Sequence, residues 1–229
     1  MTRVDLTSAF LIHRRAFKDS SLLLDFFTLE HGRIRLVGQG LRKSKTPIQA
    51  FQHLKISYSG KGDLKSLRSW EVDDTPRHLK GDNLILGVYV NELISRLLHE
   101  QDAHYELFDI YKNFITRLNT IEASYSHWLL RLFENSLLQE LGYGVDHSYD
   151  VASIEIDLNA LYEYQHQQGF ARSVTGKISG KLIHQLLIDD VNNMPEPQQL
   201  RVCRDLNRSR LKLLLGDKPL QSRSLFFSK

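Results

Sequence analysis

The 229-residue sequence has one cysteine, five prolines and no run of eighteen apolar residues. A single thiol, Cys203, forms no internal disulfide and cannot build a cysteine-based zinc site, so no bound metal is expected. The missing apolar run excludes a transmembrane helix, and the N-terminus lacks the apolar core and cleavage site of a signal peptide. We therefore expect a cytoplasmic protein that does not enter a membrane.

Catalytic motifs are also missing. Gly180-Lys181 is followed by Leu182, where a phosphate-binding loop needs Ser or Thr to reach magnesium. His99 and His104 are five residues apart, about 140° around a helix, and cannot share a face as a zinc-binding pair does. No Gly-x-Ser-x-Gly occurs, and the acid pairs that a nuclease would need for metal are isolated: Asp73-Asp74 and Asp189-Asp190. We expect no catalytic residues and no cofactor.

Positive charge is concentrated in the first third of the chain. The formal net charge is +3, but residues 1–80 carry fifteen Lys/Arg against eight Asp/Glu. Residues 81–229 carry fifteen Lys/Arg against nineteen Asp/Glu, which makes them mildly acidic. This asymmetry indicates an anionic partner for the first part only.

Five short strands are predicted before residue 76. They are apolar or alternating segments separated by turn residues such as His31-Gly32 and Gly60-Lys61-Gly62. The five segments are AFLIHRR, LLLDFFT, RIRLVG, FQHLKISYSG and DLKSLRSWEV. Five strands without a long helix suit a small closed barrel. The five-stranded OB barrel is the commonest such module, although an SH3-like barrel has the same strand count.

Helical periodicity begins after a charged linker at residues 73–83. Apolar residues recur at helical spacing in five segments: 86–97, 107–118, 126–144, 178–191 and 198–216. The third of these is expected to end at Gly142, and residues 143–175 contain few helix signals apart from an extended segment turning at Gly169. The expected fold class is α+β, with an OB domain at residues 1–76 and a mostly helical domain at residues 77–229.

The basic first domain is the strongest indication of function. Nucleic acid crosses an open face of an OB barrel, where cations contact its phosphates. The candidate DNA-binding residues lie on the third strand, in the loop after it, and around the last hairpin: Arg33, Arg35, Arg42, Lys43, Lys45, Lys61, Lys65 and Arg68. The alternative is that these are solvated edge and loop charges, which also prevent sheets from aggregating. Tyr58, Phe51 and Trp70 either stack on bases or fill the barrel core, and their positions favour the core.

A second candidate site lies in the segment WLLRLFENSLLQEL. Arg131 stands between two leucines, with Trp128 and Leu138 as neighbours at helical spacing. A cation rimmed by apolar groups suits an acidic peptide with a hydrophobic anchor. The residues alone favour the alternative, an arginine that extends past the edge of a helix bundle into water.

Four separated blocks resemble the RecO family of bacterial DNA repair and recombination mediators. They occur in the family's order and cover residues 8 to 227: AFLIHRRAFKDSSLLLDFFTLEHGRIRLVGQGLRKSK, GVYVNELISRLL, ENSLLQELGYGVD and GDKPLQSRSLF. The resemblance implies an N-terminal OB domain followed by a helical domain. It also implies binding of single- and double-stranded DNA, annealing of complementary strands and, with RecR, loading of RecA onto DNA covered by single-strand-binding protein (SSB).

The resemblance also implies a partner for the helical domain. In enterobacterial members this domain receives the acidic, phenylalanine-ended tail of SSB. Arg131 would then hold the carboxylates of the tail, and Trp128, Leu130 and Leu138 would form the apolar wall. Many members have a four-cysteine zinc site that this chain cannot build, so residues 143–175 are expected to form its metal-free remnant. The expected protein is a nucleoid-associated mediator without catalytic activity. The rival hypothesis is an OB-fold interaction scaffold that does not bind DNA directly.

Overall fold

A closed five-stranded barrel forms the N-terminal part of the chain. The structure is a computed structural model that describes residues 2–62, 64–75 and 77–225. The barrel strands are β1 (Thr2–Phe17), β2 (Ser21–Thr28), β3 (Gly32–Gly38), β4 (His53–Gly60) and β5 (Lys65–Val72). They close in the order β1-β2-β3-β5-β4, with only β3 and β5 parallel among these neighbours. The predicted α+β class with an N-terminal OB barrel is confirmed.

Strand β1 closes the barrel because it bends and pairs on both edges. Its first part pairs with β4 and its second part with β2, and the register shifts between Val4 and Thr7 and between Leu11 and His13. Leu6, in the first irregularity, has a φ of 57°. A bulge interrupts the alternation of side chains, which explains why residues 2–8 gave no strand signal although they belong to β1.

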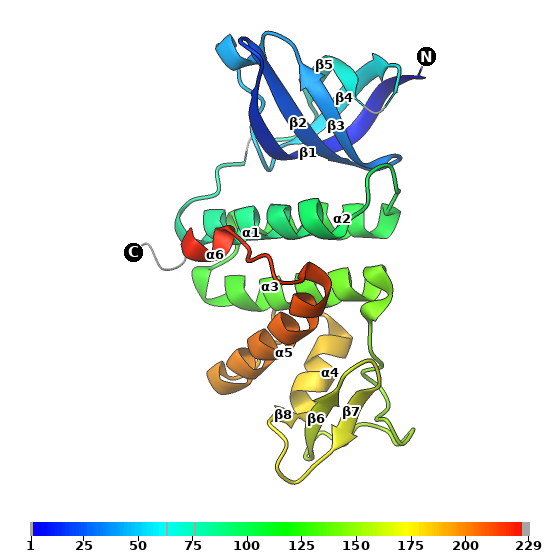
Figure 1. Cartoon of the computed structure of the whole chain (residues 1–229). Helices are drawn as coiled ribbons and strands as arrows, with labels where there is room; N and C mark the ends of the chain where they lie inside the picture. The colour runs from blue at the N-terminus through cyan, green and yellow to red at the C-terminus, as the bar shows by residue number, and fades with distance from the viewer. Residues whose placement is uncertain (1, 63, 76, 226–229) are drawn as a thin grey trace. The chain divides into compact units, whose positions relative to one another are not determined.

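The barrel strands bury side chains on two sides. One set fills the interior, including Leu24, Phe26, Leu54 and Ile56. Phe10, Phe27 and His53 point the other way and contact the rings of Phe108 and Tyr111, with centroid distances of 5.0–6.2 Å. Those two rings belong to helix α2 (Tyr105–Thr120), which lies with α1 (Gly81–Leu97) along one end of the barrel (Figure 1). The apolar pair Phe26-Phe27 is therefore buried on both of its faces.

The described residues form two compact units. Residues up to 119 and from 220 onward make the barrel unit, and residues 120–219 make the helical unit. The short helix α6 (Ser222–Leu225) belongs to the barrel unit, because Glu92 on α1 accepts hydrogen bonds from the Ser222 amide and hydroxyl at 2.8 and 2.6 Å. The change from strands to helices and the division into compact units thus fall at different places along the chain.

The helical unit combines three helices with a small sheet. Its helices are α3 (Ala123–Leu138), α4 (Gly180–Ile188) and α5 (Pro197–Leu215), and its strands are β6 (Leu161–Gln165), β7 (Gly169–Arg172) and β8 (Ile178–Ser179). The predicted turn near Gly169 is the β6–β7 hairpin. After α3 comes a π-helical turn, Gln139–Tyr143, in which Gly142 has a φ of 80°, a left-handed conformation that glycine adopts without strain.

The described residues contain neither a cluster of metal-binding side chains nor a membrane-spanning helix. No group of three or more His, Cys, Asp or Glu lies close enough to hold a metal ion. Cys203 is buried in α5, and burial raises the pKa of its thiol to about 12. No helix in the described part of the chain is long and apolar enough to cross a membrane.

Candidate functional site

Two loops of the barrel meet, and six cations lie in these loops or at the end of β1 that leads into them. The β1–β2 turn is joined to the loop after β3, because the Arg42 amide donates to the Ser20 carbonyl at 3.0 Å and the Arg42 guanidinium to the Lys18 carbonyl at 3.3 Å. Arg14 reaches the same loop through the Ile48 carbonyl, at 3.1 Å. We call the resulting group the basic rim, and its members are all exposed: Arg14, Arg15, Lys18, Arg42, Lys43 and Lys45.

The basic rim has the chemistry of a phosphate-binding surface. Its loop contains a short 3₁₀ turn, Leu41–Lys43, after Gly40 with a φ of 72°, so Arg42 and Lys43 stand on ordered backbone. The β1–β2 turn contributes one acid, Asp19, which is also exposed. Exposed cations at this density attract a polyanion through charge, without reading a sequence.

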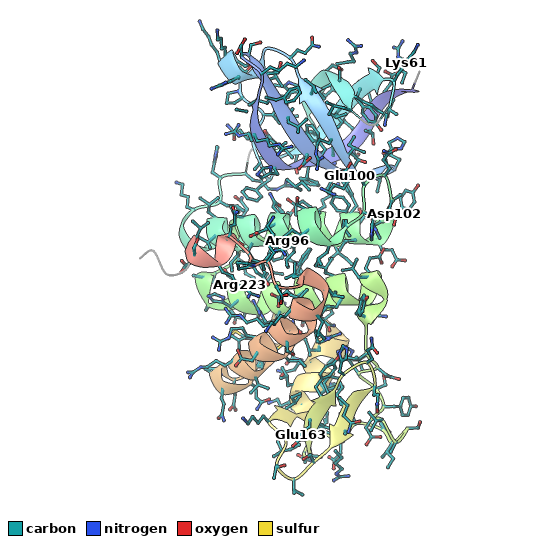
Figure 2. The ribbon with its side chains drawn as sticks, viewed as in Figure 1. Lys61, Arg96, Glu100, Asp102, Glu163 and Arg223 are labelled. Carbon is teal, nitrogen blue, oxygen red and sulfur yellow. The ribbon has the colours of Figure 1, made fainter. Side chains whose placement is uncertain are left out.

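A second basic group surrounds the β4–β5 hairpin. The pairing of β3 with β5 places Lys65 beside Leu36, so this group flanks the strand that leads into the basic rim. Arg68 is exposed and its Nε donates to the Ser59 hydroxyl at 2.6 Å. Lys61 is exposed at the end of the barrel farther from α1 and α2 (Figure 2).

The two β3 arginines are already paired. Arg35 Nε donates to Asp25 Oδ1 at 2.8 Å, and Arg35 Nη2 lies 3.0 Å from Glu100 Oε1. The same Glu100 oxygen is 3.4 Å from Arg33 Nη2. The hydrogen bond with Asp25 raises the pKa of Arg35, against a smaller lowering by burial. Arg33 and Arg35 do share the outward face of β3, as predicted, but the structure places them in ion pairs.

The three aromatic candidates lie in or against the protein interior. Tyr58 belongs to the barrel core, and Trp70 packs against it while half-buried. Phe51 is buried and lies against Gly87 of α1, where an added Cβ would come within 2.9 Å of its ring. Their positions match the packing alternative rather than base stacking.

Arg131 is part of a buried polar seam between α3 and α5. Its Nη1 lies 2.9 Å from Glu134 Oε2, and the Glu134 side chain is fully buried. Asn207 Nδ2 donates to the same carboxylate at 3.1 Å and to the Arg131 carbonyl at 3.2 Å. The residues proposed as an apolar wall are buried as well: Trp128, Leu130 and Leu138. As the structure stands, these four side chains do not offer an open surface to a peptide.

An open pocket lies beside the seam, within the helical unit. Its volume is about 230 Å³, and its lining includes Tyr143, Tyr164, Arg210 and Leu213. The Arg210 guanidinium is buried; it bonds the Tyr143 carbonyl at 2.8 Å and lies 5.7 Å from the centroid of the Tyr164 ring. Burial lowers the pKa of Arg210, and its Nε has no hydrogen-bond partner among the described residues. Because that Nε is itself buried, the pocket offers a carboxylate on an apolar body the charge of the guanidinium beside apolar and aromatic groups, not a free donor.

The sequence reasoning missed several of these residues. Arg14, Arg15 and Lys18 belong to the basic rim, and the signal for them was a cation doublet just before a predicted turn. Arg210 was missed because it stands on the apolar stripe of α5, at helical spacing from Cys203 and Leu206. An arginine among the apolar residues that form the buried face of a helix was the signal in the sequence that could have identified it.

Comparison with known proteins identifies the family. The family model described as Recombination protein O N terminal matches residues 1–75, and the one described as Recombination protein O C terminal matches residues 78–223. The chain belongs to the RecO family. It is 37% identical over 224 residues to the DNA repair protein RecO of Actinobacillus pleuropneumoniae serotype 5b (strain L20), covering 96% of this chain and 93% of that protein. It is 38% identical over 226 residues to the DNA repair protein RecO of Salmonella schwarzengrund (strain CVM19633), covering 95% and 92%.

Membership of the RecO family gives the chain a role in DNA repair and recombination. In this RecO-family chain the basic rim exposes its cations, and the pocket at Arg210 exposes Leu213.

Proposed function

We propose that this RecO-family protein is a mediator that binds single- and double-stranded DNA through phosphates and anneals complementary strands. With RecR, it would help to load RecA onto SSB-coated DNA. The observation that carries the DNA-binding part is the basic rim, six exposed cations in two joined loops and at the adjoining end of β1. In this proposal residues 1–76 are the DNA-binding domain and residues 77–229 the partner-binding domain.

The proposed mechanism needs no nucleotide hydrolysis and no catalytic residue. Two complementary strands repel each other, and a cationic surface that holds both reduces that repulsion. Docking to SSB would raise the local concentration of the barrel near coated DNA, so affinity there increases without any new DNA contact. The proposed roles, DNA binding by the barrel and SSB binding by the helical part, fit the distribution of charge, because the barrel is the more basic of the two.

The SSB tail is the proposed partner of residues 77–229. The first hypothesis places its carboxylates on Arg131, with Trp128, Leu130 and Leu138 as the wall. Because those side chains are buried, binding there requires α3 and α5 to separate locally. Arg210 is buried as well, but the pocket that it lines also exposes Leu213, so we propose this pocket as a second docking point.

Leu213 allows the two docking points to be separated without disturbing the core. Its side chain lines the pocket and is 60% exposed. Leu213→Glu places a carboxylate at the pocket and should weaken binding of an SSB-tail peptide, measured by fluorescence anisotropy. Leu187→Glu, at an exposed position on α4 outside that lining, is the matched control. Equal peptide affinities of the two variants would remove the pocket from the proposal.

The DNA-binding proposal is tested with charge-matched variants. The rim variant replaces three cations with alanine: Arg42, Lys43 and Lys45. The control variant replaces three exposed lysines of the helical unit: Lys177, Lys181 and Lys212. We expect the rim variant to bind oligo-dT more weakly and to anneal complementary strands more slowly, while the control variant retains wild-type values.

The rival function is an OB-fold scaffold that binds protein and not DNA. It predicts no salt-dependent shift of oligo-dT by the wild-type chain at either 50 or 200 mM salt. A shift that weakens at the higher salt excludes this scaffold, because release of counterions from phosphates causes such a dependence.

A further inference from the structure

The loop between α1 and α2 covers part of the open edge of β3. Glu100 forms a parallel bridge with Arg33, and the Gln101 amide donates to the Arg33 carbonyl at 2.9 Å. Gly32, at the start of β3, leaves room for this segment: an added Cβ would lie 1.7 Å from the Asp102 carbonyl oxygen. Backbone contacts therefore hold residues 100–102 against the strand, and the Glu100 side chain is carried into position with them. Figure 2 shows Glu100 and Asp102 near the end of the barrel that faces α1 and α2.

The Glu100 carboxylate forms ion pairs with both arginines of the outward face of β3, while the buried Nε of Arg33 has no hydrogen-bond partner among the described residues. One oxygen lies 3.0 Å from Arg35 Nη2 and 3.4 Å from Arg33 Nη2. A phosphodiester oxygen forms the same charge-assisted contacts with guanidinium groups. Strand β3 leads from these arginines directly to the loop of the basic rim, and the β2–β3 face of an OB barrel is its usual oligonucleotide surface. Glu100 thus occupies the place that a nucleic-acid phosphate would take.

Exposure makes this carboxylate exchangeable. The Glu100 side chain is 36% exposed, and an ion pair at such a position is a weak contact. Asp25 is different: it belongs to β2, is directly opposite Arg35 in the strand register, and its side chain is only 13% exposed. Losing Glu100 would leave Arg35 oriented by Asp25, with Nη2 turned toward the position that Glu100 had occupied.

We propose that Glu100 competes intramolecularly with nucleic-acid phosphates for Arg33 and Arg35, so that the segment 100–102 limits how far DNA extends from the basic rim along β3. The proposal rests on DNA binding by the rim. It assigns Arg33 and Arg35 to a second, masked part of the same surface, which is available only when Glu100 gives way.

The test removes the charge of Glu100 and keeps its shape. Glu100→Gln should bind oligo-dT more tightly than the wild type, with a log–log salt dependence steeper by about 0.7 for each arginine that gains a phosphate. If both arginines do so, the advantage of the variant shrinks about sevenfold between 50 and 200 mM salt. Adding Arg35→Gln to the variant should abolish at least half of the extra slope.

Asp102→Asn is the matched control. It removes one negative charge from the same loop, and the Asp102 side chain is 62% exposed and approaches His104 rather than an arginine. An equal gain in Asp102→Asn and Glu100→Gln would mean that only net charge matters, and it would overturn the proposal. So would a Glu100→Gln slope equal to the wild-type slope with an unchanged melting transition. If the wild type shows no salt-dependent DNA binding at all, the proposal that the rim binds DNA is refuted, and the Glu100 proposal is refuted with it.

Discussion

Replacing Arg131 with alanine would remove one of the two cations that interact with a buried carboxylate in the helical unit, the other being Arg210. Glu134 is fully buried, and its Oε2 is 2.9 Å from Arg131 Nη1. Removing one member of a buried pair costs about 3–5 kcal/mol, because the remaining charge cannot reach water. Asn207 Nδ2 still donates to that oxygen in the variant and offsets only about 1 kcal/mol. Because Arg210 also remains near Glu134, Arg131→Ala should lower the free energy of unfolding by about 3 kcal/mol, the lower end of that range.

The measurement is urea unfolding followed by far-UV circular dichroism, with thermal melting as a second readout. For a chain of this size, each kcal/mol lowers the melting temperature by about 2–4 °C, so a decrease on the order of 10 °C is expected. The double variant Arg131→Met, Glu134→Gln removes both charges and keeps an acceptor for Asn207, and it should recover most of the loss. A stability of Arg131→Ala within about 0.5 kcal/mol of the wild type would refute the buried-pair reasoning. The double variant also allows peptide binding to be measured on a folded protein that lacks Arg131.

Two further predictions concern stability. Burial lowers the pKa of His147 from 6.5 to about 4, so the unfolded chain takes up a proton at a higher pH than the folded chain does. The contribution of neutral His147 to the free energy of unfolding should be fully present above pH 6.5 and fall by roughly 3 kcal/mol as the pH decreases toward 4. In urea unfolding at pH 7 and pH 5, His147→Phe should lose less stability between the two pH values than the wild type does. An equally steep loss in the variant would contradict the assignment. Gly32 has a φ of 58° and a Cβ there would overlap the Asp102 carbonyl, so Gly32→Ala should cost about 2 kcal/mol or more. An unchanged melting temperature would show that residues 100–102 are not packed on β3.

Local sequence patterns predicted a helix or strand well where only one of its faces is buried. Alternation in β4 placed Leu54, Ile56 and Tyr58 on one face, and all three are buried in the barrel core. The pair Phe26-Phe27 read only as an apolar run, because the second partner, α2, is about eighty residues away in the sequence. The start of β1 was missed because bulges break its alternation.

The candidate sites were less predictable because their electrostatics depend on distant residues. The cations of the loop after β3 could be read directly from the sequence. The neutralisation of Arg33 and Arg35 could not, because Glu100 approaches them across more than sixty residues of chain. Glu134 was visible three residues from Arg131, a spacing that permits a pair on a helix. Its burial was not visible, since α5 covers it from another part of the sequence.

The central claim is that the basic rim contacts DNA phosphates, and the salt dependence of binding tests it most directly. Affinity for oligo-dT is measured from 50 to 200 mM salt for the wild type, the rim variant lacking Arg42, Lys43 and Lys45, and the control variant lacking Lys177, Lys181 and Lys212. Each lost contact should reduce the log–log slope by about 0.7, so the rim variant should be flatter by up to about 2. The control variant should keep the wild-type slope. Identical slopes for all three proteins would contradict the account.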